Sequence, residues 1–379
     1  MTVETVLSNA RIVLADEIVE GSLVLRDGFI AGIDAGTGRI GEDMGGDYII
    51  PGLVELHTDH LEGHYAPRPK VRWNPIAAVL AHDAQVATAG ITTVLDALRV
   101  GMDEDADLTL DDIRRLADAI EDSVGQDRLR ADHFLHLRCE VSAPDCLNAF
   151  ANFDGDERVR LASLMDHAPG QRQFVNLETY AYYYQRKLKL SDRDFQKFCE
   201  KRMDESARNS GPNRVFIAAA CQERGIVLAS HDDATSAHVD EAIEQGVRVA
   251  EFPTTEEAAR ASKAAGLGVL MGAPNVMRGA SHSGNVSART LASDGLLDIL
   301  SSDYIPFSLI QSAFFLGDMV EGISLPQAVA MVSKNPAQAV GLDDRGVIEQ
   351  GRRADLVRVR VDDHVPVVRT VWRQGRRVA

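Results

Sequence analysis

The feature that most constrains the fold is a strict alternation of apolar strand-like and helix-like segments between residues 51 and 339. The strand-like segments are 53–57, 91–98, 134–141, 159–167, 226–231, 249–252, 267–271 and 297–303. Sequence able to form a helix follows each of the first seven; in 74–89, for example, Asn74 and Pro75 favour a helix start and Gly90 a stop. Such alternation predicts a parallel sheet, and eight units predict a closed (β/α)8 barrel of the TIM type. An open doubly wound sheet is the alternative, but no GxGxxG follows the first strand.

The two ends of the chain have a different pattern, with short strand-like segments separated by turns. Residues 1–50 and 340–379 both read this way, and neither end alone has enough strands for a stable sheet. We therefore expect the two ends to pair into one small composite β-sandwich domain beside a barrel of residues 51–339.

Composition limits the partners of this fold. The chain has 40 Lys and Arg against 57 Asp and Glu, a formal charge of -17 that disfavours nucleic acid and anionic membranes. There is no basic and apolar leader and no apolar run of 18 residues, so we expect a cytoplasmic protein without a membrane span. The four cysteines have no CxxC spacing, which indicates reduced thiols rather than a zinc knuckle or a disulfide framework.

Metal-capable side chains gather where the predicted strands end. Residues 49–64 read IIPGLVELHTDHLEGH, and the period of a strand places His57 and Asp59 on one face. The carboxyl ends of barrel strands meet at one rim, so these two should converge with Glu140, His167, His231 and Asp303. Imidazoles and carboxylates together are sufficient to hold two divalent ions, with one carboxylate bridging. Such a pair activates a water at neutral pH, and the reaction class it predicts is hydrolysis.

These residues resemble the amidohydrolase superfamily in PGLVELHTD, in His231 and Asp303 at strand ends, and in the late GVIEQGRRADLV. The resemblance implies an amidohydrolase-type barrel with metal ligands His57, Asp59, Glu140, His167, His231 and Asp303, and with Asp303 as the catalytic residue. Family members usually have HxH on strand one, a carboxylated Lys on strand four and His on strands five and six. This sequence has HxD on strand one, Glu140 for the bridging role and no His on strand six.

A narrower resemblance is to the diphosphatases of the bacterial carbon–phosphorus lyase pathway for phosphonate breakdown. The blocks that carry it include HTDHLEGHYAPRPKVRW, SLMDHAPGQRQF, LASHDDAT and VLMGAPNVMRGASHSGN. The implied reaction releases diphosphate from alpha-D-ribose 1-methylphosphonate 5-triphosphate and leaves the 5-phosphate. The implied cofactor is a pair of divalent ions, with Zn or Mn favoured by the mixed ligands and the phosphate substrate.

A strongly anionic phosphate and phosphonate substrate requires local cations and donors, because the chain itself is acidic. Loops predicted to lie on the catalytic rim supply the substrate-binding residues that we expect, namely His60, Arg68, Lys70, Arg172, Arg278, Ser281 and His282. In the mechanism we expect, Asp303 takes the proton from the water that attacks phosphorus. Asp166, Asp232 and Asp233 are its rivals, or they orient the imidazoles.

Two other functions stay open, as does the role of one segment. An amidohydrolase acting on an amide, N-acetyl or cyclic C–N substrate uses the same barrel, although the rim cations speak against a neutral pocket. A catalytically inactive barrel with an assembly role would lack the ligands that are present here.

Residues 180–213 are too long for a bare loop and should contain a helix of their own. A lid, a homodimer contact and a plain insertion are all open for this segment.

Overall fold

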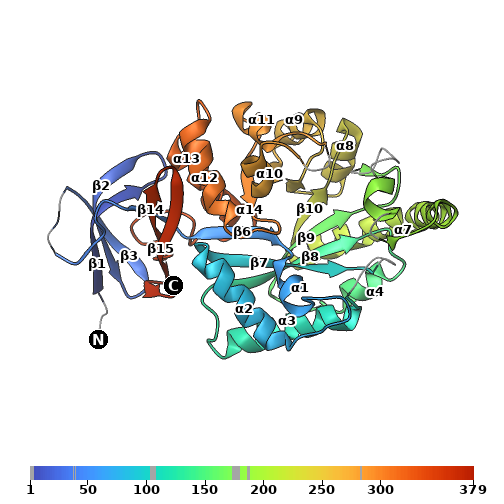
Figure 1. Ribbon diagram of the computed structural model, residues 1–379, viewed down its shortest axis with the longest axis horizontal. Helices are drawn as coiled ribbons and strands as arrows, with labels where there is room; N and C mark the ends of the chain where they lie inside the picture. Colours follow the sequence, from blue (N-terminus) through green and yellow to red (C-terminus); the bar gives the residue numbers. More distant parts are fainter. Residues whose placement is uncertain are drawn as a thin grey trace.

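The computed structural model describes residues 4–36, 38, 40–102, 108–172, 180–185, 188–281 and 284–379. Figure 1 shows a barrel with a smaller β domain beside it, and the labelled chain ends both lie on the side of the small domain. The predicted barrel is confirmed, because eight strands pair in sequence order and every pair is parallel. These strands are β6 (Leu53–Thr58), β7 (Ile91–Val100), β8 (Asp132–Glu140), β9 (Val159–Met165), β10 (Val227–His231), β11 (Val249–Glu251), β12 (Gly268–Gly272) and β13 (Ile299–Ser301).

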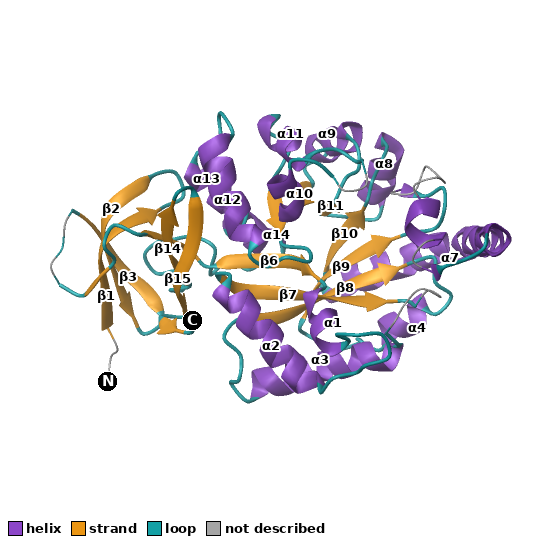
Figure 2. Ribbon diagram, in the orientation of Figure 1, coloured by secondary structure: helices purple, strands orange, loops and turns teal. Residues whose placement is uncertain are grey.

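Helices surround the strands on the outside of the barrel (Figure 2). They are α1 (His60–Tyr65), α2 (Pro75–Thr88), α3 (Leu110–Gly125), α4 (Cys146–Ala151), α7 (Asp192–Arg224), α8 (Ser236–Glu244), α9 (Glu256–Ala264), α10 (Ala273–Arg278), α11 (Ala288–Ser293), α12 (Ser308–Met319), α13 (Leu325–Ala330) and α14 (Lys334–Ala339). Local sequence sets their ends: the Asn74 side chain accepts a hydrogen bond from the Ala77 N–H at the start of α2. Gly90, with φ of +92°, follows the end of that helix. In the described part of the chain, no helix combines the length and hydrophobicity that a membrane crossing requires.

One buried carboxylate helps to close the barrel between its first and last strands. Glu55 of β6 accepts hydrogen bonds of 2.6 Å from the backbone N–H groups of both His57 and Ser302. The Asp303 N–H donates to the His57 carbonyl at 3.2 Å, and Thr58 and Asp303 form a parallel bridge. Burial raises the pKa of Glu55 to about 7, although these hydrogen bonds oppose the shift. The closure brings Asp303 next to the end of strand β6.

The small domain takes strands from both ends of the chain, as predicted. Its sheet contains β1 (Glu4–Val13), β2 (Ile18–Arg26), β3 (Phe29–Ala35), β4 (Glu42–Asp43), β5 (Tyr48–Pro51), β14 (Leu356–Asp362), β15 (Val365–Arg373) and β16 (Arg376–Arg377). Strand β5 joins the two contributions, because it pairs with β1 on one side and with β14 on the other. The sheet encloses an apolar core that includes Leu7, Ile12, Leu356 and Trp372. We propose to keep the domain boundaries at 50/51, before the last residue of β5, and at 339/340, directly after α14.

The segment 180–213 contains most of a helix, as expected, and this helix continues beyond the segment to Arg224. Helix α7 begins after Ser191, whose hydroxyl accepts from the Asp194 N–H, and it runs for 33 residues. A short π-helical turn, Ala181–Gln185, precedes it. Tyr180 packs against Phe198 of α7 in a small apolar cluster of its own. A lid or a homodimer contact stays a prediction for this segment.

A buried histidine behind the barrel wall gives a prediction about pH and stability. His133 of β8 lies 2.8 Å from an Asp96 carboxylate oxygen and 3.4 Å from one of Asp83. Burial alone would lower the pKa of His133, but the two carboxylates outweigh burial and raise it to about 9, from an ordinary 6.5. The charged form therefore stabilises the fold below about pH 6.5, and this stabilisation is lost as the pH rises through about 9.

The variant His133→Gln should lower the free energy of unfolding by roughly 3 kcal/mol at pH 6 and by clearly less at pH 10. Urea unfolding at the two pH values measures this difference. His364→Gln is the control, because the His364 side chain is 76% exposed. Equal losses for His133→Gln at both pH values would contradict the account.

Candidate active site

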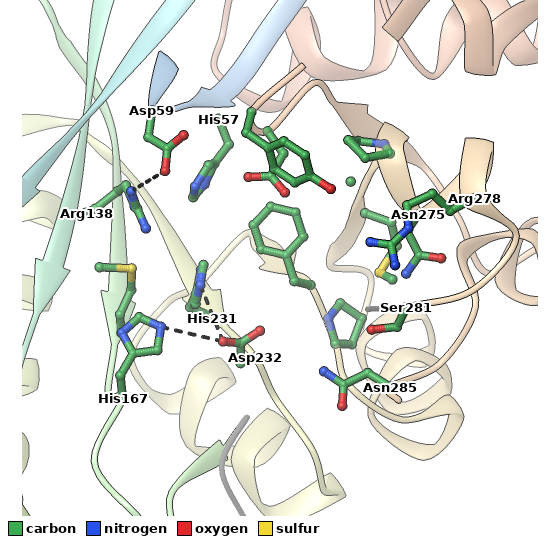
Figure 3. Close-up of a pocket in the computed structure, with 18 of the residues that line it drawn as sticks. His57, Asp59, Arg138, His167, His231, Asp232, Asn275, Arg278, Ser281 and Asn285 are labelled. Atoms are coloured by element: carbon green, nitrogen blue, oxygen red, sulfur yellow. Dashed lines mark hydrogen bonds and ion pairs between the residues drawn. The ribbon is translucent and has the colours of Figure 1, made fainter. Parts of the chain in front are cut away.

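A pocket of about 450 Å³ opens at the carboxyl ends of the barrel strands. Side chains at or just after the ends of β6, β9, β10, β11, β12 and β13 line one part of it, and the region of α10 lines another (Figure 3). Seven of the residues predicted from the sequence meet here: His57, Asp59, His167, His231, Arg278, Ser281 and Asp303. The expectation that strand ends converge therefore holds for this group.

Three of the lining side chains come close enough to share one ion. The Nε2 atoms of His167 and His231 lie 3.7 Å and 3.5 Å from the same Asp232 carboxylate oxygen. Figure 3 shows both imidazoles turned toward this carboxylate. Their ligand atoms all lie within 4.8 Å of one another, which is the size of a single metal site.

Two fully buried carboxylates stand behind these imidazoles and fix their orientation. Glu140 contacts Nδ1 of His167 at 2.6 Å, while Glu251 contacts Nδ1 of both His57 (3.1 Å) and His231 (3.2 Å). A carboxylate on one ring nitrogen leaves the other nitrogen for a metal, and it makes the imidazole a stronger ligand. Glu140 does not line the pocket among the described residues, so its side chain supports His167 from behind.

The electrostatics of this wall favour positive charge. Burial alone would lower the pKa of His167, but the carboxylates of Glu140 and Asp232 outweigh burial and raise the pKa to about 10. Burial would raise the pKa of Glu251, yet the His57 and His136 imidazoles hold it well below its usual range. Anionic carboxylates thus surround the imidazoles, and this donor set fits a divalent cation.

Backbone geometry at the strand ends is unusual. Asp232, Phe252 and Asp303 follow β10, β11 and β13 directly or after one residue, and their φ angles are +57°, +53° and +56°. A side chain other than glycine rarely adopts this region, and such conformations gather at functional sites because the surrounding structure enforces them. Here they turn all three side chains into the pocket.

The wall opposite the imidazoles is polar and cationic. Arg278, the last residue of α10, lies there with Asn275, Ser281 and Asn285 (Figure 3). These groups donate hydrogen bonds, and a guanidinium matches phosphate oxygens in shape and charge. The pocket therefore has a metal-capable wall and an anion-capable wall.

The other residues predicted to bind substrate lie elsewhere. His60 is the first residue of α1, which turns its ring away from the pocket to contact Gln85 of α2 at 2.8 Å. Arg68 and Lys70 are exposed in the loop after α1 and do not line the pocket. His282 lies outside the described residues.

Arg172 also lies apart from this pocket. It is buried, pairs with the carboxylates of Asp233 and Glu241, and lines a second cavity of about 510 Å³. Asp166, one of the rivals for proton handling, accepts hydrogen bonds from Ser206 and Ser210 of α7. Of the three rival carboxylates, only Asp232 lines the main pocket among the described residues.

Some residues of the site were not predicted from the sequence. Glu251 ends strand β11, the sixth barrel strand, where we noted only the absence of a His. Arg138 lines the pocket and pairs with Asp59 at 3.2 Å. Glu62 lines the pocket as well, and it belongs to the metal-capable side chains that the sequence places within residues 49–64. Burial raises the pKa of Glu62 to about 7. The position of Glu251 at a strand end was a signal that could have identified it, whereas Arg138 gave no such signal.

Comparisons with known proteins agree with this geometry. A model of the amidohydrolase family matches residues 204–379. The chain is 50% identical over 377 residues to alpha-D-ribose 1-methylphosphonate 5-triphosphate diphosphatase of Escherichia coli (strain K12), covering 98% of this chain and 100% of that protein. It is 24% identical over 368 residues to imidazolonepropionase of Thermoplasma volcanium, covering 93% and 87%.

Solved structures share the fold. The 5-methylcytosine deaminase of Klebsiella pneumoniae matches with a TM-score of 0.66 at 15% identity, covering 99% of this chain and 97% of that one. The N-acetylglucosamine-6-phosphate deacetylase of Pasteurella multocida matches with a TM-score of 0.62 at 15% identity, covering 98% and 99%. At this identity the likeness shows the fold alone. The near full-length relative shows more: the chain belongs to the amidohydrolase family, in the group that includes alpha-D-ribose 1-methylphosphonate 5-triphosphate diphosphatase.

Proposed function

We propose that this protein is a metal-dependent hydrolase that releases diphosphate from alpha-D-ribose 1-methylphosphonate 5-triphosphate during phosphonate breakdown. The observation that carries the proposal is the 50% identity, over essentially the whole of both chains, to the diphosphatase of Escherichia coli (strain K12). The pocket supports it, because metal-capable side chains face a wall with Arg278 and several amide and hydroxyl groups. A triphosphate needs both features.

Members of this family typically bind divalent metal ions, and His167, His231 and Asp232 form one group able to hold one. We propose a centre of two divalent ions, Zn or Mn, with His57, Asp59, His167, His231 and Asp303 as ligands and Asp232 added to them. Glu140 and Glu251 would support the imidazoles. Glu140 would then not bridge the two ions, although the family resemblance had implied this role. When bound, such ions lower the pKa of a water and offset negative charge on phosphate oxygens.

The side chains of the pocket would then have separate roles in catalysis. Asp303 lines the pocket beside the end of β6, where its carboxylate can take a proton from the attacking water. Arg278 and Asn275 would hold phosphate oxygens and offset charge that develops on the diphosphate leaving group.

A comparison of substrates tests the function. The metal-loaded protein is given the ribosyl triphosphate, ATP or N-acetylglucosamine 6-phosphate, and the release of diphosphate and acetate is followed. The proposal predicts diphosphate from the ribosyl triphosphate with the highest kcat/KM of the three substrates. Acetate release without diphosphate release would favour the amide-directed alternative instead.

The pocket wall gives a further prediction for substrate binding. Replacing Arg278 by Ala should raise the KM for the ribosyl triphosphate about 10- to 100-fold, because a charged hydrogen bond contributes about 1.5–3 kcal/mol. Steady-state kinetics measures this change. Arg68→Ala is the matched control, since Arg68 is an exposed arginine outside the pocket. A larger rise in KM for Arg68→Ala than for Arg278→Ala would contradict the placement of the anion-binding wall.

A further inference from the structure

A second group of histidines lies outside the active-site pocket, between helices α1 and α2. His60 and His64 stand four residues apart on α1, so their side chains share one face of the helix. Glu62 stands between them on the opposite side and lines the pocket. The short helix α1 thus separates two clusters, one on each side.

The two α1 imidazoles converge on a single atom. Nε2 of His60 lies 2.8 Å, and Nε2 of His64 lies 3.1 Å, from the same side-chain oxygen of Gln85 on α2. The ring centroids are 5.0 Å apart and the rings are nearly perpendicular, at 89°. A pair of histidines at positions i and i+4 of a helix binds a metal ion in the same way, with two ring nitrogens directed at one point.

A third imidazole completes the group from the interior. His82 of α2 is fully buried, and its ring centroid lies 6.2 Å from that of His60 and 6.1 Å from that of His64. Its Nε2 contacts the Asp96 carboxylate at 2.8 Å, whereas its Nδ1 has no hydrogen-bond partner in the described part of the chain. A buried ring nitrogen left unpaired costs about 1–3 kcal/mol. A carboxylate on the opposite nitrogen is the usual support of a histidine that ligates metal.

We propose that His60, His64 and His82, with the Gln85 side-chain oxygen as a fourth donor, form a second metal site for a transition ion such as Zn²⁺. Three imidazoles favour Zn, Ni or Cu over Mg or Ca, which prefer oxygen ligands. Zinc–nitrogen bonds are about 2.0–2.1 Å long. In this structure the ring nitrogens of His60, His64 and His82 do not all lie within 4.8 Å of one another. The side chains of His60, His64 and Gln85, all half-buried, therefore have to turn to close around an ion.

The ion would act as a clamp. It would join α1 to α2 and so fix the segment that carries His57, Asp59 and Glu62 at the pocket. The His60–His64 pair and the unpaired His82 nitrogen carry this inference, which does not depend on the proposed hydrolase function.

Equilibrium dialysis against Zn²⁺, followed by elemental analysis, tests the site in the full-length protein. We expect His64→Phe to hold one zinc ion per chain fewer than the wild type. His364→Phe is the matched control, because it removes an exposed histidine, and it should hold the wild-type number. His60→Asn is the second variant, in case His64→Phe does not fold as judged by circular dichroism, and it should also lose one ion. The same number of ions in the wild type and in a folded His64 or His60 variant would overturn the proposal.

Discussion

Replacing Asp303 by Asn is expected to reduce kcat by roughly 10³-fold or more, because an amide cannot take a proton from the attacking water. The metal content should stay near that of the wild type, since imidazoles on β6, β10 and after β9 remain in place. Steady-state kinetics and elemental analysis on the same preparation separate the two effects.

The control for this variant is Asp318→Asn, which changes an Asp whose side chain is 51% exposed and which is not among the pocket-lining residues. Its kinetics should match the wild type. Full activity in Asp303→Asn would refute the role of Asp303 as proton acceptor. Of the three rival carboxylates, Asp232 is the one that lines the pocket in the described part of the chain, and it would then be the proton acceptor.

The second large effect should come from Glu251→Gln, although Glu251 does not line the pocket. Its carboxylate contacts Nδ1 of both His57 and His231, and it is fully buried. An amide cannot accept hydrogen bonds from both rings with the same geometry and charge. Loss of such a supporting carboxylate typically lowers metal affinity 10- to 100-fold. Removing one partner of a buried charged group also costs about 3–5 kcal/mol of unfolding free energy.

Metal titration and urea unfolding measure the two consequences of Glu251→Gln. Glu244→Gln is the control, because Glu244 is exposed at the end of α8. Both variants remove one negative charge, so a difference between them reports position and not net charge. Wild-type metal affinity in Glu251→Gln would show that His57 and His231 do not depend on this carboxylate.

The barrel was predictable because its signal is local and repeated. Each strand is a short apolar run, and some helices carry their own start and stop, as Asn74 and Gly90 do for α2. The ends of parallel strands must meet at one rim, and this rule alone placed His57, His231 and Asp303 together. The composite β domain followed from a similar argument about unpaired strands at both ends.

The errors in the site arose where position depends on contacts between distant segments. Arg172 follows strand β9, as a rim residue should, but the carboxylates of Asp233 and Glu241 draw it into another cavity. His60 lies only three residues after His57, yet the start of α1 at His60 turns its side chain to α2. Loop direction and long-range ion pairs leave no periodic trace in a sequence.

Glu251 is a supporting residue that could have been predicted from its position at the end of a strand. Strand β11 is only three residues long, and Glu251 is its last residue. Its importance comes from simultaneous contact with imidazoles on β6 and β10. Those contacts exist only because the barrel brings the inward face of β11 toward the ends of the other strands.

The measurement that tests the central claim most directly is phosphorus NMR of one protein sample in three states: metal-loaded, stripped by a chelator, and reloaded. With alpha-D-ribose 1-methylphosphonate 5-triphosphate as substrate, the account predicts equimolar diphosphate and ribosyl 5-phosphate in the first and third states and neither product in the second. Unchanged triphosphate signals in the metal-loaded sample, or full turnover after stripping, would contradict a metal-dependent diphosphatase.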